Sequence, residues 1–187
     1  MKKLLVVLAL IMPMFLNAQE KETKSNSKTL EFLEKDGSVF KKEFYDLPTV
    51  GKSYNKTENQ VLIITDLKSN EKRGCFRIIT KYPTNSGSDS YIGTLDPDEL
   101  DAAVLSLEKI INEIIPNTAE TYTEVEYKTR DGVQIGTYWN EKKNEWTLYV
   151  QTKRYSSRSL SSFKSDELTT LIDNLKKAKQ MIVDKTK

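Results

Sequence analysis

Two stretches decide the fold: residues 98–115, DELDAAVLSLEKIINEII, and residues 166–183, DELTTLIDNLKKAKQMIV. In each, apolar side chains recur every three or four residues, the spacing of an amphipathic helix with one buried stripe. Asp96 followed by Pro97, and Ser165, are the predicted N-caps. A shift of 68 positions aligns the Asp-Glu-Leu that opens one stretch with that of the other. The chain is therefore predicted to contain an internal repeat.

Alternating strand patterns lie upstream of both helices. Asp36-Gly37 separates residues 29–35 from 38–45, and Asp131-Gly132 separates residues 122–129 from 133–139. Asp-Gly between such runs predicts a hairpin, because these residues tolerate the positive φ of a tight turn. A second hairpin in each half pairs 60–67 with 75–82 and 133–139 with 145–153, and short extended pieces at 90–95 and 158–163 lead into the helices. The first half is longer by about one strand and a loop, at 46–59.

These patterns predict an α+β fold made of two antiparallel β-meander–helix repeats, 29–115 and 122–187, related by pseudo-two-fold symmetry. Each half supplies one helix to cover a sheet. We expect one domain over 29–187, since the connection at 116–121 is too short and ordinary for a linker. Two separable domains are the alternative.

The N-terminus has the pattern of a secretory signal peptide. Lys2 and Lys3 precede an apolar run over residues 4–16, and Ala18 offers a small residue for cleavage. We expect residues 1–18 to be removed, residues 19–28 to form a flexible lead-in, and the chain to reach the periplasm or the extracellular space of a Gram-negative bacterium. The only cysteine, Cys75, is far from the cleavage point, which argues against a lipid anchor. No membrane span is expected in the mature chain.

Composition excludes several kinds of chemistry. The 187 residues include no histidine and one cysteine, so His-based triads, His-metal sites and an internal disulfide are ruled out. We expect no cofactor, no metal and no catalytic residues, and Cys75 to be a partly buried thiol. Without the leader the chain has 27 basic and 27 acidic residues, distributed as net −4 over 19–121 and net +4 over 122–187. A neutral chain is a poor generic binder of polyanions.

The candidate binding residues are aromatic and basic side chains of the second half. Alternation sends Trp146, Leu148 and Val150 to one face of their strand and Tyr149 and Lys153 to the other. If the tryptophans face the helix, Tyr138, Tyr149 and Lys153 share the exposed face, with Arg154, Tyr155 and Arg158 just beyond in a serine-rich loop. Tyrosine with arginine provides rigid apolar area and charge-assisted hydrogen bonds. The alternative is that these side chains simply cover an exposed sheet.

A four-strand meander followed by a helix that opens with Ser-Asp-Glu-Leu, repeated in tandem, resembles the Whirly and PUR-type single-stranded nucleic-acid-binding folds. The resemblance rests on residues 146–182 and on 76–114. It implies two sheets cradled by two helices and leaves open a homodimer formed through the helices. It does not carry the function across, because those families act inside cells or organelles and usually present a basic sheet.

Three functions follow as hypotheses. The first is an exported non-enzymatic module that binds a protein, a glycan or an envelope component through the exposed sheet face. The second is single-stranded nucleic-acid binding outside the cell, with aromatic stacking and the basic half. The third is a carboxylate-dependent hydrolase, which needs two acidic residues across a cleft.

Overall fold

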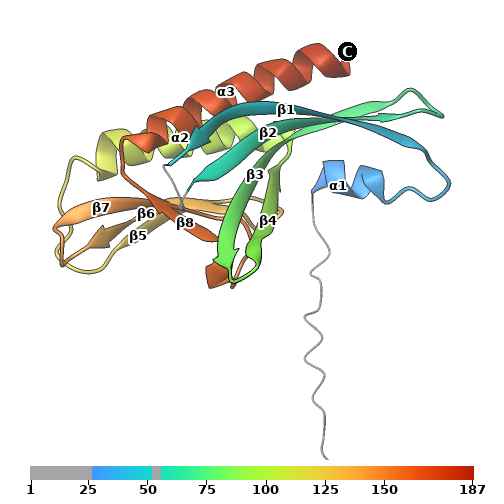
Figure 1. The fold of residues 1–187 in the computed structure, drawn as a ribbon. Helices are drawn as coiled ribbons and strands as arrows, with labels where there is room; N and C mark the ends of the chain where they lie inside the picture. The colour runs from blue at the N-terminus through green and yellow to red at the C-terminus, as the bar shows by residue number, and fades with distance from the viewer. Residues whose placement is uncertain (1–26, 52–55) are drawn as a thin grey trace, which may run out of the picture.

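The computed structural model describes residues 27–51 and 56–187, and its first half forms a four-stranded antiparallel sheet (Figure 1). The strands are β1 (Phe40–Val50), β2 (Thr57–Asp66), β3 (Lys72–Thr84) and β4 (Gly87–Leu95), in the order β1-β2-β3-β4. Gln60 pairs with Arg77 in the β2–β3 hairpin, which confirms the predicted pairing of these segments. The predicted signal peptide lies outside the described residues.

The second half forms another four-stranded antiparallel sheet. Its strands are β5 (Glu124–Lys128), β6 (Gln134–Asn140), β7 (Glu145–Gln151) and β8 (Leu160–Phe163), in the order β5-β6-β7-β8. Gly132 has φ 86° in the β5–β6 turn, the positive φ expected of the Asp-Gly pair. Both hairpins predicted for this half are confirmed.

Helices follow each sheet, so the α+β class is confirmed. The first run comprises η2 (Pro97–Glu99), α2 (Leu100–Lys109) and η3 (Ile110–Ile114), the last with π-type geometry. The second sheet is followed by α3 (Glu167–Thr186), and the short helix η4 (Ser157–Ser159) lies between β7 and β8. Leu107 and Leu175, central to the two apolar stripes, are completely buried. Each half contains four strands, so the extra strand expected in the first half is absent from the described residues. The pseudo-two-fold symmetry stays a prediction.

The strand predicted at residues 29–35 is wrong, because this segment contains the helix α1 (Lys28–Leu33). The backbone N–H groups of Lys28 and Thr29 donate to the Asp96 carboxylate over 2.8 and 3.1 Å, and Ser27 Oγ accepts from Leu30 N. Phe32 packs with Leu62, Ile64 and Cys75. The acceptor at residue 96 lies far along the chain, so the local alternation of residues 29–35 could not indicate this helix. The strand expected from 158 also begins later, at Leu160, after the η4 turn.

The helix that ends the second half covers the sheet of the first. Helix α3 packs on β1, β2 and β3, and α2 lies against α3 and β5 (Figure 1). Asn174 Nδ2 on α3 donates to Pro48 O over 2.7 Å, and Tyr127 OH on β5 donates to Glu99 O over 3.2 Å. Each half thus contributes a helix, but α3 does not lie over the sheet that precedes it. The apolar faces of the two sheets are therefore buried by elements from both halves of the chain.

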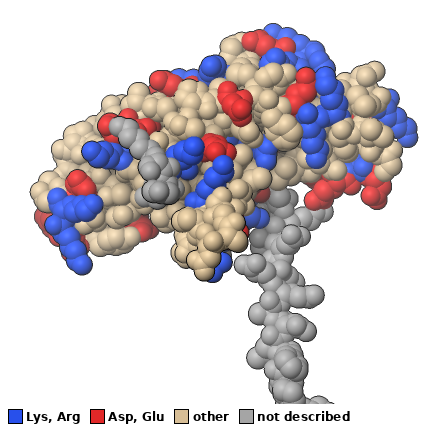
Figure 2. Space-filling model, in the orientation of Figure 1, with Lys and Arg blue, Asp and Glu red and all other residues tan. Residues whose placement is uncertain are grey.

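One large buried cluster joins both sheets and both helices. Its members include Ile63 and Phe76 from the first sheet, Ile135 and Leu148 from the second, and Leu171 from α3. Helix α1 covers part of the opposite face of the first sheet. Among the described helices, none is long and apolar enough to cross a membrane. Figure 2 shows basic and acidic side chains interspersed over the visible face.

Candidate functional site

The six predicted binding residues fall into two groups. Tyr138 on β6 and Tyr149 on β7 lie on the outer face of the second sheet, opposite the buried Leu148 and Val150. Lys153, Arg154, Tyr155 and Arg158 lie in the loop between β7 and β8. We call Tyr138 and Tyr149 the sheet-face group and the other four residues the loop group. The sequence predicted one surface for all six, whereas the structure places them in two regions.

Three tyrosines form a row across the sheet-face group. The ring centroids of Tyr122 and Tyr138 are 6.3 Å apart, and those of Tyr138 and Tyr149 are 6.2 Å apart. Tyr122 is 61% exposed, whereas Tyr149 is only 5% exposed. Tyr149 is thus the buried member of the row. The accessible ring surface of the row belongs to Tyr122 and Tyr138.

Two glutamates on β5 lie beside this row. Tyr149 OH donates to Glu126 Oε2 over 3.0 Å, Gln134 Nε2 donates to the same oxygen, and Tyr122 OH donates to Glu124. The hydrogen bond to Glu124 raises the pKa of Tyr122 to about 12, and burial together with Glu126 raises the pKa of Tyr149. Both phenols therefore keep their protons and donate to neighbouring carboxylates.

The tyrosines and glutamates border a shallow hollow of about 290 Å³, which we call the face hollow. Its other lining residues are mostly polar: Gln134, Gln151, Leu160 and Ser162. Lys128 Nζ lies 3.5 Å from Glu126 Oε1 and offsets part of the negative charge. Phenol hydroxyls and an amide hold the carboxylates in place, so the hollow is ordered before any ligand arrives.

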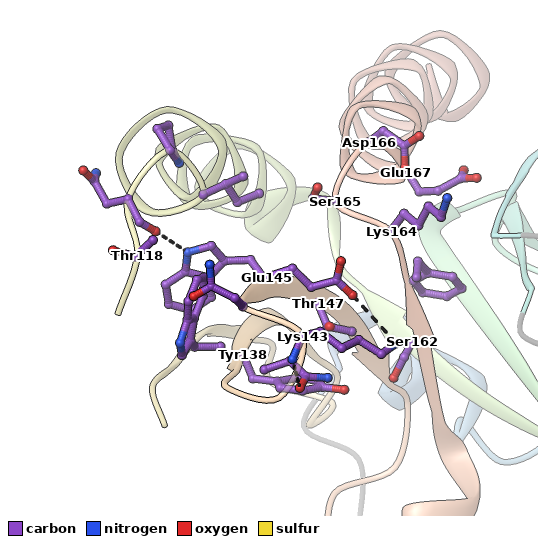
Figure 3. Close-up of a pocket in the computed structure, with 18 of the residues that line it drawn as sticks. Thr118, Tyr138, Lys143, Glu145, Thr147, Ser162, Lys164, Ser165, Asp166 and Glu167 are labelled. Atoms are coloured by element: carbon purple, nitrogen blue, oxygen red, sulfur yellow. Dashed lines mark hydrogen bonds and ion pairs between the residues drawn. The ribbon is translucent and has the colours of Figure 1, made fainter. Parts of the chain in front are cut away.

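A larger cleft of about 960 Å³ adjoins the face hollow and shares Tyr138 and Ser162 with it (Figure 3). It lies where the β6–β7 turn, the segment after η3 and the start of α3 meet. Trp139 and Trp146 form its base in an edge-on contact with centroids 5.4 Å apart. Trp146 Nε1 donates to Asn117 O over 2.6 Å, so its polar atom is already occupied.

Acidic residues line two sides of this cleft, which is the arrangement that the hydrolase hypothesis requires. Glu145 comes from β7, and Asp166 and Glu167 come from the start of α3 (Figure 3). Glu145 lies 3.7 Å from Lys143 Nζ, and Glu167 accepts from Gly51 N over 3.3 Å. A carboxylate in the first turn of a helix is also a common stabilising feature. Glu145 and Glu167 thus already interact with other groups of the protein.

The loop group is held by buried Ser159. Its Oγ accepts from Lys153 N over 3.0 Å and lies within hydrogen-bond distance of the carbonyls of Lys153 and Ser156. Tyr155, at the tip, has φ 64° and is 85% exposed. The Arg154 guanidinium lies 4.6 Å from the centre of the Tyr155 ring. The loop therefore presents aromatic and basic groups on an ordered backbone.

Tyr122, Glu124 and Glu126 are not among the binding residues predicted from the sequence. A usable pattern was present: these residues alternate with Val125 and Tyr127, which pack against the core. That alternation, read across the Asp131-Gly132 hairpin, places Glu124 opposite Tyr138. The larger cleft had no comparable pattern, because its walls come from segments far apart in the chain.

Within residues 27–51 and 56–187, no group of three or more potential metal-ligating side chains is present. Burial raises the pKa of the Cys75 thiol to about 12, so it is not primed as a nucleophile. A scan against protein-family models and a search of the curated proteins gave no match to this chain.

Proposed function

We propose that this protein is an exported, non-enzymatic binding module whose ligand docks on the outer face of the second sheet. The observation that carries the proposal is the face hollow, an open surface with accessible tyrosine rings and oriented carboxylates. On the first sheet, helix α1 occupies part of the corresponding face. The second sheet has no described helix over its outer face, which leaves the hollow accessible.

The chemistry of the hollow favours a ligand with a positive charge. The faces of Tyr122 and Tyr138 attract a cation through their ring quadrupoles, and Glu124 and Glu126 attract it by charge. The same carboxylates repel nucleic-acid phosphates, so this face disfavours the nucleic-acid alternative. We therefore favour a protein partner that presents lysine or arginine side chains.

The proposal is tested by calorimetric titration of the purified protein with hexalysine, with hexaglutamate and a neutral maltohexaose as comparison probes. We expect hexalysine to bind most tightly, because it alone complements the hollow in charge. Replacing both acids, Glu124→Gln with Glu126→Gln, should weaken hexalysine binding by about tenfold.

The matched control is Glu108→Gln with Glu113→Gln, which removes the same charge from exposed ion pairs elsewhere. Equal weakening by the control pair would reduce the effect to overall charge and contradict the assignment. Tighter binding of maltohexaose would point to a glycan ligand instead.

A further inference from the structure

A second surface lies where two loops meet, next to the face hollow. Figure 1 shows the β3–β4 turn and the β7–β8 loop side by side at one tip of the molecule. The Arg158 guanidinium, from the β7–β8 loop, lies 5.4 Å from the ring centre of Tyr82, which lies on β3 close to the β3–β4 turn. We call Tyr82, Lys153, Arg154, Tyr155 and Arg158 the basic tip.

The backbone of the basic tip is fixed in place. Ser159 is completely buried and binds both Lys153 N and the neighbouring carbonyls. Gln151 Nε2 donates to Ser156 O over 3.0 Å. Within this frame Tyr155 has φ 64°, a conformation that bulky residues seldom adopt. The hydrogen bonds of the loop therefore keep Tyr155 at a positive φ that tyrosine disfavours, with its ring exposed to solvent.

The side chains of the basic tip are aromatic and positively charged. Tyr155 is 85% exposed and Tyr82 is 40% exposed, with Leu160 next to the loop at 42%. Among residues 27–51 and 56–187, no ion pair joins Lys153, Arg154 or Arg158 to a carboxylate. Asp89, which pairs with Tyr82 in the ladder, is an acidic residue on the same hairpin. Three positive groups thus remain available to an external anion.

We propose that the basic tip docks the protein on an anionic phospholipid surface. The lysine and arginines would contact headgroup phosphates, while the two tyrosines sit at the depth where amphipathic rings are most stable. A single nucleic-acid strand fits less well, since it needs a groove with successive free ring faces. None of the residues of the basic tip lines the face hollow or the larger cleft. Within the tip, the Arg154 guanidinium lies over the Tyr155 ring.

The test is co-sedimentation of the purified protein with phosphatidylcholine vesicles that contain increasing fractions of phosphatidylglycerol. Binding should rise with phosphatidylglycerol and fall with added salt. The triple variant Lys153→Gln, Arg154→Gln, Arg158→Gln should lose about a hundredfold in vesicle affinity. The matched control is Lys42→Gln, Lys68→Gln, Lys177→Gln, which removes the same charge from exposed sites elsewhere and should change little.

The contribution of the ring is tested separately with Tyr155→Gly. Glycine adopts φ 64° readily, so this variant removes the ring while keeping the loop conformation. Vesicle binding should weaken while hexalysine binding at the face hollow stays unchanged. Vesicle binding that does not depend on the fraction of phosphatidylglycerol overturns the proposal. An equal loss of vesicle affinity in the control triple variant overturns it too. Tighter binding of a single-stranded oligonucleotide that the tip variant abolishes would assign the tip to nucleic acid and overturn it as well.

Discussion

At the scale of single residues, the buried carboxylate of Asp96 connects three parts of the chain. It accepts from Ser27 Oγ over 3.0 Å and from the backbone at the start of α1, and Arg130 Nη2 lies 3.0 Å from it. Its side chain is completely buried. Arg130 follows β5, so one carboxylate ties the N-terminal helix to the second sheet.

Replacing Asp96 should therefore destabilise the folded state. Asp96→Ala leaves the buried donors at the start of α1 without their acceptor and removes one of the carboxylates paired with Arg130. We expect the free energy of unfolding to fall by about 3–5 kcal/mol. Urea denaturation measures this change. Asp98→Ala, which removes an exposed carboxylate from the same arginine, should cost less than about 1 kcal/mol. Equal losses would show that the cluster acts only through exposed charge.

The same carboxylate predicts a pH dependence. Burial raises the pKa of Asp96, but hydrogen bonds from Thr29, Lys28 and Ser27 outweigh it, so the folded-state pKa lies below the usual 3.8. A lowered folded-state pKa stabilises the fold above the usual value, and that stability is lost as the pH falls toward the folded-state pKa. The free energy of unfolding should drop below about pH 4. Asp96→Asn should flatten this drop, and an unchanged acid limb in that variant would contradict the assignment.

At the scale of elements, β4 is the strand through which the two sheets meet. A Cβ atom added at Gly93 would overlap Val133 Cγ2 and lie 3.1 Å from Thr152 O, both from the second half. Thr80 Oγ1 on β3 and Thr152 Oγ1 are 2.8 Å apart in the same region. Glycine is required here because the strands of one sheet approach the backbone of the other.

Gly93→Ala should consequently lower the free energy of unfolding by about 1–3 kcal/mol, through forced displacement of Val133 and of the second sheet. Thermal unfolding followed by circular dichroism checks this. Ser90→Ala, an exposed position on the same strand, is the control and should be nearly neutral. A neutral Gly93→Ala would mean that the sheets are less closely packed than described.

The elements also show what sequence could and could not predict. The two amphipathic helices, the β2–β3 hairpin and both hairpins of the second half followed from local periodicity and from the Asp131-Gly132 turn. The hairpin predicted at Asp36-Gly37 is wrong, because a helix precedes this turn. Helix α1 was not predicted, because its N-cap Ser27 is assisted by Asp96, an acceptor far along the chain. The burial of Tyr149 was equally hidden, since it depends on Tyr138 and Glu126 from neighbouring strands. Alternation gives the face of a side chain, and only the tertiary neighbours determine how exposed it is.

At the scale of the whole molecule, the two sheets are covered unequally. The first sheet has α3 on one face and α1 on part of the other, whereas the second has its apolar face in the shared core and its outer face open. Placement of α3 on the first sheet joins the halves through a common core. This asymmetry distinguishes the outer face of the second sheet as the candidate binding surface.

Occupation of this face by the ligand is tested by mapping hexalysine-induced amide chemical-shift changes in the isotope-labelled protein. We predict that the changes concentrate at residues 122–126, 134–138 and 149–151, around the face hollow. Changes concentrated on α3 or within the tryptophan-based cleft, with these three segments unmoved, would contradict the claim.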